Sequence, residues 1–423
     1  MKIDGVNSNF EREKLRFPFG FKGGYLTELW QTVVRLRSGN HSSVGLATQS
    51  VLYGDPVLFS KYSEAGGNAL MYSLTEQVLS EIKGSEIDDH ISFFNNELIP
   101  VSRKIAERIT GLNNVNPNFV LNALVSIDNA LWGLRSGVTG STVLEDLIPE
   151  PFRESLSHRN EKVGIMFQVS YNMDISDIQK AAYQGYFIIK IKTGQPGTQE
   201  EMLQKDKDRL SEIHRVLKNY RTPQTKDGRL IYTIDANGRY YKKETLERFI
   251  DFASEIGALD HILFIEEPLS EENDEYVGDL PVPIAADDSV HTVDDVKVRL
   301  EKGYGVIVLK GIAKSLSLSI QMATVAHKQK IPCVCSDLTV NPILVDWHKN
   351  LASRLAPFPG LEMGIMETNG DMNYVTWNEM KKYHNGGKDA WTDAQDGVFS
   401  LNGEFYQTSG GIFTSSSHYE SVV

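Results

Sequence analysis

The sequence predicts an α/β protein in which a TIM-like β/α barrel follows an N-terminal α+β capping domain. From about residue 160, short β-branched runs alternate with longer segments of helical period. Several of these runs also stop on charged residues, and a parallel barrel brings the carboxyl ends of its strands to one face. The charged ends are IIKIK at Lys190 and Lys192, LIYTID at Asp235, ILFIE at Glu266, PIAAD at Asp287 and VIVLK at Lys310.

The predicted barrel has eight strands with helical crossovers between them. In the crossover 200–219, the apolar positions fall on one helical face. Another crossover begins at a capping box of Thr292 and Asp295 and stops at Gly303. The strands are expected at 162–171, 187–192, 230–235, 261–266, 283–287, 306–310, 332–337 and 361–366.

The residues before the barrel do not show this alternation of strands and helices. Segments 26–39 and 42–54 predict a β-hairpin whose turn holds Ser38, Gly39, Asn40 and His41, and helical segments follow near 73–84, 91–111 and 119–137. A polar stretch with a proline at 150–162 favours a boundary there. We therefore expect a capping domain at 1–155, a barrel at 156–372, and a Gly-rich C-terminal segment at 373–423 that packs on the capping domain.

Composition excludes some classes of function. The net charge of -13 disfavours a nucleic-acid partner, which needs clustered Lys and Arg. The N-terminus is charged, and no stretch of about 18 apolar residues occurs, so we expect a cytoplasmic protein without a membrane partner. Cys333 and Cys335 lie too close along one strand to form a good disulfide and are interpreted as small buried apolar residues.

The acidic strand ends predict a metal site. Asp235, Glu266 and Asp287 follow one another at intervals of about one β/α unit, and hard cations such as Mg²⁺ prefer oxygen ligands from different elements. A single acid after a strand is as often a turn or helix cap. Glu267 and Asp288 follow two of these acids, and because successive strand residues point to opposite sides, only one of each pair can face the metal. Periodicity leaves that choice open.

The basic strand ends predict proton transfer. Lys190 and Lys192 share a face of their strand, and like charges close together, with desolvation, favour a neutral amine that can act as a general base. Lys310 lies on a strand across the barrel from them. A base on one side, an acid on the other and a metal between them suit removal of a proton from carbon and its return.

The motif set KIK, IDANG, FIEEP, AADDS and VLKGIAKS resembles the enolase superfamily, in the branch of muconate lactonizing enzymes, dipeptide epimerases and succinylbenzoate synthases. The helix ALVSIDNALWGL at 123–134 is also similar to the one that precedes the barrel in that family. The resemblance implies Mg²⁺ on Asp235, Glu266 and Asp287, supported by Asn237. It also implies that Lys192 is the base, that Lys190 lowers the pKa of Lys192 and reaches the substrate carboxylate, and that Lys310 acts on the opposite face.

The implied reaction is proton abstraction next to a carboxylate, with the metal and the lysines stabilising the enediolate charge. A racemase, epimerase or cycloisomerase is the expected isomerase. The alternatives are an acid-sugar dehydratase or another lyase of the same superfamily, and a catalytically silent barrel with a binding role. Mandelate racemase carries a His/Asp dyad where this chain has Asp337 and Lys310 at the corresponding strand ends, which disfavours dyad chemistry.

Two features bear on the substrate. Dipeptide epimerases carry Asp-x-Asp at the end of the eighth strand, whereas this chain has Met366-Glu367-Thr368-Asn369, in which Glu367 is the candidate contact for a substrate cation. The segments 16–24 and 50–59 match the family's specificity loops, with Lys22 as a cationic substrate contact. Their aromatic residues either form an apolar lid or pack the domain interface: Phe17, Phe19, Phe21, Tyr53 and Phe59. We expect a small carboxylate-bearing substrate and a homo-oligomer.

Overall fold

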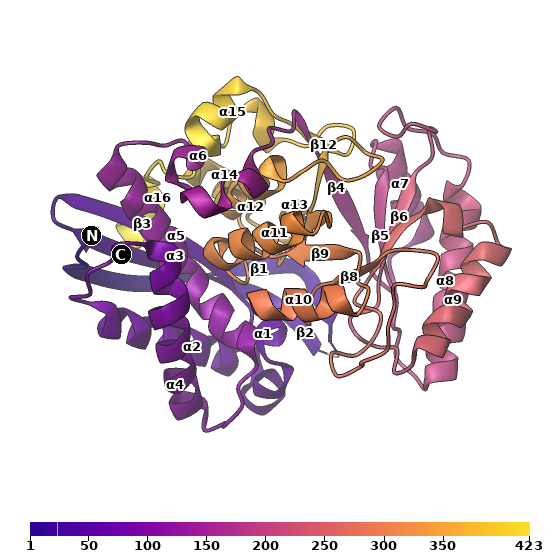
Figure 1. Ribbon diagram of the computed structural model, residues 1–423, viewed down its shortest axis with the longest axis horizontal. Helices are drawn as coiled ribbons and strands as arrows, with labels where there is room; N and C mark the ends of the chain where they lie inside the picture. Colours follow the sequence, from indigo (N-terminus) through magenta and orange to yellow (C-terminus); the bar gives the residue numbers. More distant parts are fainter. Residues whose placement is uncertain (23) are drawn as a thin grey trace.

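A computed structural model describes residues 1–22 and 24–423; the side chain of Phe21 is outside the description. The chain begins with an antiparallel sheet in the order β1-β2-β3 (Figure 1). Its strands are β1 (Gly5–Phe21), β2 (Gly24–Ser38) and β3 (His41–Gln49). The β2–β3 hairpin was predicted, and Ser38 pairs with His41 across a turn in which Gly39 has a φ of 57°.

Strand β1 was not predicted. Its polar residues pair with β2 from Gly5 to Lys14, and after an irregularity the pairing resumes at Phe19. The segment 16–24, expected as a loop, therefore includes the end of a long hairpin. Sequence reasoning missed this strand because its residues face water and vary irregularly in polarity, so the pairing with the more apolar β2 decides its conformation.

Helices cover one face of this sheet, and together they form the cap, which we define as β1–β3 with α1–α5. Helix α5 packs across β3 and β2, and a Cβ at Gly45 would meet the Ser126 carbonyl oxygen at 2.0 Å, so only glycine permits this approach. The helical segments are α1 (Val51–Gly54), α2 (Pro56–Ile82), α3 (His90–Phe93), the π-helix η1 (Phe94–Leu98), α4 (Ile99–Thr110) and α5 (Pro117–Thr139).

The barrel strands run parallel in sequence order from β4 to β11, and β11 pairs with β4 to close the barrel. This agrees with the predicted fold class, and each strand lies at the expected place. The strands are β4 (Lys162–Val169), β5 (Ile188–Lys192), β6 (Ile231–Asp235), β7 (Ile262–Glu266), β8 (Ile284–Ala286), β9 (Val306–Leu309), β10 (Cys333–Cys335) and β11 (Gly364–Glu367).

Helices connect the strands and lie outside them (Figure 1). The predicted capping box of Thr292 and Asp295 is present at the start of α10. The helices of the barrel and of the link before it are α6 (Leu144–Leu147), η2 (Glu150–Phe152), η3 (Glu154–Leu156), α7 (Ile175–Tyr183), α8 (Gln199–Leu217), α9 (Lys243–Glu255), η4 (Leu259–His261), α10 (Val293–Glu301), α11 (Leu316–Lys328) and α12 (Pro342–Arg354).

The C-terminal segment contacts both the barrel and the cap. Strand β12 (Val398–Ser400) pairs antiparallel with β4, whereas α16 (Ser417–Val422) lies beside β2, where Arg35 donates a hydrogen bond to the Glu420 carbonyl oxygen. Both termini consequently lie at the cap (Figure 1). The remaining elements are α13 (Gly370–Asn373), α14 (Trp377–Tyr383), η5 (Ala390–Thr392), α15 (Gly403–Thr408) and η6 (Ser409–Gly411).

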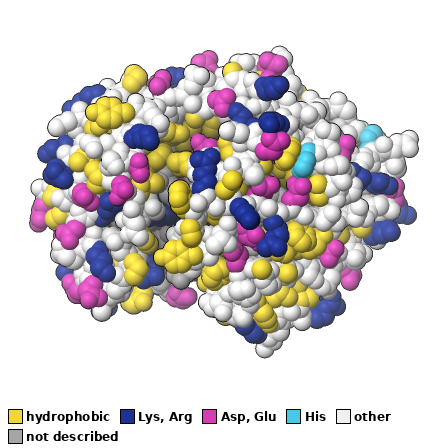
Figure 2. All heavy atoms as spheres, turned by 180° about the vertical axis from the view of Figure 1, so that it is seen from behind, with side chains coloured by type: hydrophobic (Ala, Val, Ile, Leu, Met, Phe, Trp, Pro, Cys, Tyr) yellow, Lys and Arg dark blue, Asp and Glu magenta, His cyan; other side chains and the backbone are white. Residues whose placement is uncertain are grey.

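Two further properties bear on the expected class. Cys333 and Cys335 are free and buried on β10, as predicted, and burial raises the pKa of Cys335. Within residues 1–22 and 24–423, no helix is both long and apolar enough to cross a membrane. On the face shown in Figure 2, acidic and basic side chains are interspersed.

Candidate active site

Three carboxylates lie side by side at the carboxyl ends of adjacent barrel strands. Asp235 ends β6 and pairs in register with Glu266, which ends β7, and Asp287 directly follows β8. All three side chains are at most 1% exposed. Asp235 and Glu266 are register partners, whereas Asp287 lies two residues beyond Ala285, the register partner of Glu266. We call Asp235, Glu266 and Asp287 the carboxylate arc.

A lysine flanks each end of the carboxylate arc. Lys192 ends β5, the neighbour of β6, and its Nζ lies 2.5 Å from Asp235 Oδ2. Lys310 follows β9, the neighbour of β8, and its Nζ lies 2.6 Å from Asp287 Oδ2. Burial alone would lower the pKa of Lys310, but the charges of Asp287 and Asp288 outweigh burial and raise it well above its usual value. The two predicted proton-transfer residues thus lie on opposite sides of the arc.

Lys190 lies beneath the mouth of the barrel, among acids. Its Nζ is 2.9 Å from Glu266 Oε1, 3.0 Å from Glu367 Oε2 and 3.1 Å from Asp235 Oδ2. Burial opposes its charge, but these carboxylates raise the pKa of Lys190 well above its usual value. We expected Lys190 to reach the substrate carboxylate. The structure shows Lys190 1% exposed, paired with protein carboxylates and lining the same pocket as Lys192, so its contact with a substrate carboxylate stays a prediction.

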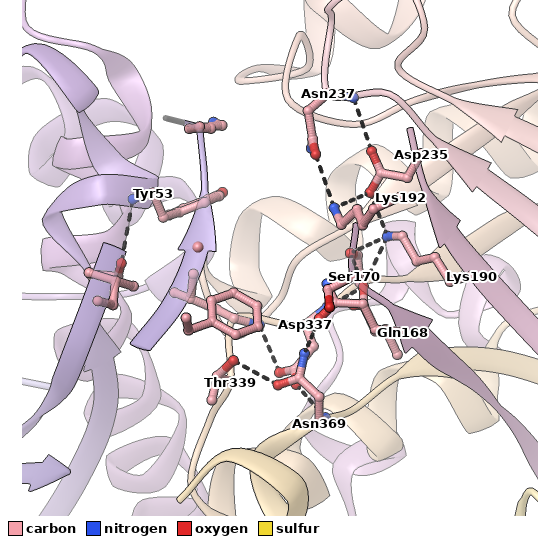
Figure 3. A pocket seen from close by; sticks show the side chains of 18 of the residues that line it. Tyr53, Gln168, Ser170, Lys190, Lys192, Asp235, Asn237, Asp337, Thr339 and Asn369 are labelled. Carbon is pink, nitrogen blue, oxygen red and sulfur yellow. Dashed lines mark hydrogen bonds and ion pairs between the residues drawn. The ribbon is translucent and has the colours of Figure 1, made fainter. Parts of the chain in front are cut away.

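Glu367 and Asn237 support these lysines. The Oε2 atom of Glu367 accepts hydrogen bonds from Lys190 and from the Ser336 hydroxyl at 2.8 Å, which lowers the pKa of Glu367 despite its burial. Asn237, expected to support the metal shell or the substrate, accepts a bond from Lys192 at 3.0 Å and donates its backbone N–H to Asp235 Oδ1 at 3.1 Å. Asn237 has a φ of 48°, and Figure 3 shows it beside Lys192 and Asp235.

The structure separates the two members of each acidic doublet. Glu267 has a φ of 37°, which turns it away from the arc, and its Oε2 accepts the backbone N–H of Asp287 at 2.6 Å and the Ser289 hydroxyl at 2.9 Å. Burial raises the pKa of Glu267 to about 7. Asp288 faces the cap, where its Oδ2 is 3.1 Å from Lys22 Nζ. Glu266 and Asp287 are therefore the doublet members that join the arc.

The carboxylate arc has the donor chemistry that a hard divalent cation requires. Among the described residues, however, the carboxylates of the arc are not close enough together to form a metal-binding group. Lys190 Nζ lies between Asp235 and Glu266, within 3.1 Å of each. Asp287 Oδ1 is buried with no hydrogen-bond partner among the described residues. Glu266 Oε2 also lacks a hydrogen bond there, although Lys190 Nζ is 2.9 Å away, and burial together with Asp235 raises the pKa of Glu266. Buried carboxylate oxygens without donors fit a site for Mg²⁺.

The cap supplies the other wall of the pocket. Lys22, Phe19 and Tyr53 line it, and Lys22 Nζ lies 5.5 Å from the centre of the Tyr53 ring. Phe17, in contrast, is 79% exposed and does not line the pocket. Phe59 is partly buried against the apolar residues of the cap, and Phe21 and Gly23 fall on parts outside the described residues.

A polar wall at the ends of β4, β10 and β11 was not assigned from the sequence. It contains Gln168, Asp337, Thr339 and Asn369, all of which line the pocket (Figure 3). Burial and the charge of Glu367 raise the pKa of Asp337 to about 7, although its Oδ2 accepts the backbone N–H of Asn369 at 2.9 Å. The only sequence signal for this wall was its position at or just beyond the ends of predicted strands, which these residues share with ordinary strand-end and turn residues.

Comparison with known proteins agrees with this architecture. The family described as enolase C-terminal domain-like matches residues 175–386. The L-Ala-D/L-Glu epimerase of Bacillus subtilis has a TM-score of 0.67 at 14% identity, covering 95% of this chain and 97% of that one. The 2-chloromuconate cycloisomerase of Rhodococcus opacus 1CP has a TM-score of 0.64 at 18% identity, covering 95% and 94%.

A dipeptide epimerase of Enterococcus faecalis V583, solved with Mg and the dipeptide L-Leu-L-Tyr, has a TM-score of 0.63 at 15% identity and covers 89% of this chain and 92% of that one. No curated protein matches the sequence. A capped, closed β/α barrel with acids and lysines at its strand ends defines the class of the protein. The chain belongs to the enolase superfamily, in the branch of mandelate racemase and muconate lactonizing enzyme.

Proposed function

We propose that the protein is a Mg²⁺-dependent isomerase, a racemase, epimerase or cycloisomerase, that removes the proton next to a substrate carboxylate. The observation that carries this proposal is the order of groups around the barrel: Lys192, then the carboxylate arc, then Lys310, on five successive strand ends. A substrate carbon above the arc would therefore have one amine on each face. Family membership and the printed activities of the similar structures, epimerases and a cycloisomerase, support the same reaction class.

Each residue of the candidate active site has a distinct part in this proposal. Asp235, Glu266 and Asp287 would hold the ion, which when bound supplies positive charge that stabilises the negative charge developing on the substrate carboxylate. Lys192 would take the proton from one face, held by Asn237 in the orientation seen here. Lys310 would deliver a proton to, or take one from, the opposite face. Lys190 would act through Asp235 and Glu266, whose position it fixes.

The cap and the barrel together would shield the reacting centre from part of the solvent. Phe19, Leu26 and Leu29 from the cap hairpin line the same pocket as the lysines, so a bound substrate is partly enclosed by apolar side chains. A low-dielectric enclosure strengthens the interaction of fixed charges with a developing anion. The cap therefore contributes to stabilising the anion as well as to choosing the substrate.

The test is exchange of an α-proton for deuterium in D₂O with added Mg²⁺, measured by NMR on a panel of N-acyl amino acids, dipeptides and sugar acids. We expect exchange that requires both Mg²⁺ and at least one of Lys192 and Lys310. The proposal is overturned if no compound exchanges or turns over and calorimetry detects no Mg²⁺ binding, a result that would favour a silent barrel.

A further inference from the structure

A carboxylate of the cap is bonded to the helix that follows Lys310. Asp128 lies on α5 and Ser317 lies in the first turn of α11, and both are fully buried. Ser317 donates its backbone N–H to Asp128 Oδ2 at 3.0 Å and its hydroxyl to Asp128 Oδ1 at 2.5 Å. Trp132, one turn further along α5, donates its indole N–H to the Ser317 hydroxyl oxygen at 3.0 Å. Two residues of one cap helix thus hold one residue of the barrel.

The contact between Asp128 and Ser317 is stronger than an ordinary packing contact. Burial raises the pKa of Asp128 to about 6, so the group is a buried anion at neutral pH. A buried anion is costly unless it is hydrogen-bonded, and here both carboxylate oxygens accept a bond. Hydrogen bonds to a charged acceptor are roughly twice as strong as bonds between neutral groups. The cap therefore fixes the start of α11 firmly.

The residue just before α11 needs support of this kind. Ser315 has a φ of 83° and a ψ of 152°, a conformation that is favourable essentially only for glycine. It is fully buried, and its hydroxyl oxygen accepts the backbone N–H of Leu318 at 3.2 Å as the N-cap of α11. Such a backbone conformation persists only where the surrounding contacts hold it. The contact with Asp128, made two residues further along the chain, is one that the cap provides.

The same segment carries Lys310. The backbone N–H groups of Ala313 and Lys314 donate to the Lys310 carbonyl oxygen at 2.9 and 2.7 Å, so residues 310–314 form a tight turn. The side chain of Lys314 donates to the Asp287 carbonyl oxygen at 2.7 Å, which ties this turn to the carboxylate arc. Because the turn joins Lys310 to the start of α11, a shift of α11 would also shift Lys310 relative to Asp287.

We propose that Asp128 is a positioning residue of the active site, which fixes Lys310 from the cap through Ser317 and the strained backbone before α11. This inference rests on the proposed function, because it concerns the amine assigned to one face of the substrate. Lys192, at the other end of the carboxylate arc, is held instead by Asn237 of the barrel. Loss of the Asp128 contact should therefore affect the two faces of the substrate unequally.

The test measures α-proton exchange in D₂O with Mg²⁺ on both configurations of the N-acyl amino acid, dipeptide or sugar acid that the wild type exchanges fastest. The configuration that Lys310→Ala slows defines the Lys310 face. We expect Asp128→Asn and Ser317→Ala each to slow exchange on that face about 10- to 100-fold, since misplacing a group by about 1 Å can cost about 100-fold. Exchange on the Lys192 face should stay unchanged.

The matched control is Asn95→Ala. It removes another bond between the cap and α11, made to Gln321 one turn beyond Ser317 at 2.5 Å, and should leave exchange on both faces unchanged. Backbone amide exchange, followed by mass spectrometry, adds a readout that does not require activity. In Asp128→Asn, peptides that cover 310–317 should exchange faster than in the wild type, whereas peptides that cover 188–192 should not.

The inference is overturned if Asp128→Asn slows both faces equally or neither. It is also overturned if the peptides that cover 310–317 exchange as in the wild type, or if all peptides exchange faster alike, which would show a general loss of stability. Failure of the proposed function is seen separately, as absence of α-proton exchange in the wild type, and amide exchange then still decides whether Asp128 holds the turn.

Discussion

The ammonium group of Lys192 lies 2.5 Å from the Oδ2 atom of Asp235, its register partner on the neighbouring strand. At the other end of the carboxylate arc, Lys310 makes the equivalent contact with Asp287 at 2.6 Å. Each proposed proton-transfer residue is therefore joined to one proposed metal ligand. A lysine–aspartate pair thus lies at each end of the arc, with Glu266 between the two pairs. The first two predictions follow from this symmetry.

Replacing either Lys192 or Lys310 should slow proton exchange on one face of the substrate only. We expect Lys192→Ala and Lys310→Ala each to slow α-proton exchange about 10²- to 10⁴-fold, the usual contribution of a positioned acid or base, on opposite enantiomers of the substrate. NMR exchange on separate D and L substrates measures this. Lys205→Ala, a change on the outer helix α8, serves as the control. Loss of exchange from only one of the two variants would show a one-base reaction instead.

The acidic doublet gives a matched pair of variants for the metal. Asp287→Asn should weaken Mg²⁺ binding strongly, because it removes a charged member of the arc, whereas Asp288→Asn should retain binding, because Asp288 faces Lys22. Calorimetry gives the affinities. In the wild type, Mg²⁺ at about 100 times its Kd should add about 2.7 kcal/mol to the free energy of unfolding. Equal losses in the two variants would contradict the separation of the doublet.

A buried ion pair should anchor the C-terminal segment. Lys349 on α12 is fully buried, pairs with Asp346 and donates to the Trp391 carbonyl oxygen at 2.7 Å, and His384 bonds to the same aspartate at 2.8 Å. Lys349→Met leaves Asp346 without its cation, so it should lower the free energy of unfolding by about 3–5 kcal/mol in urea titration. The control Lys382→Met, in an exposed pair with Glu379, should change it by about 0.5 kcal/mol or less.

His90 should make stability depend on pH. It is buried beside Trp132 without hydrogen bonds to its ring nitrogens among the described residues, and burial lowers its pKa from 6.5 to about 3. The folded state thus binds fewer protons than the unfolded state between these values. The neutral His90 therefore contributes its full share of the free energy of unfolding above pH 6.5. Between pH 6.5 and 3, this contribution decreases by up to about 1.4 kcal/mol for each unit by which the pH is lowered.

His90→Phe removes that proton uptake. Urea unfolding at a series of pH values should therefore give a flatter dependence below pH 6.5 for His90→Phe than for the wild type, with similar stability above it. His158→Phe, at an exposed position before the barrel, is the matched control and should leave the slope unchanged. Identical slopes in the wild type and His90→Phe would show that another group titrates.

The sequence by itself determined the barrel and the charged residues at the ends of its strands. Short buried strands such as IIKIK and ILFIE that alternate with helices favour a parallel sheet. Closed into a barrel, that sheet carries Lys192, Asp235, Glu266, Asp287 and Lys310 at the carboxyl ends of its strands. Local signals sufficed here because strand period and helix capping act over a few residues, as at Thr292 and Asp295.

Only the tertiary structure decided the remaining features. The choice of Glu266 over Glu267 depends on one positive φ angle and on hydrogen bonds from Asp287 and Ser289, which are distant in sequence. The burial of Lys190 among three carboxylates, the edge strand β1 and the bonds from Ser317 to Asp128 likewise depend on contacts between separate elements. Periodicity reports which face a side chain occupies, whereas partners across the barrel and the cap decide what that side chain can do.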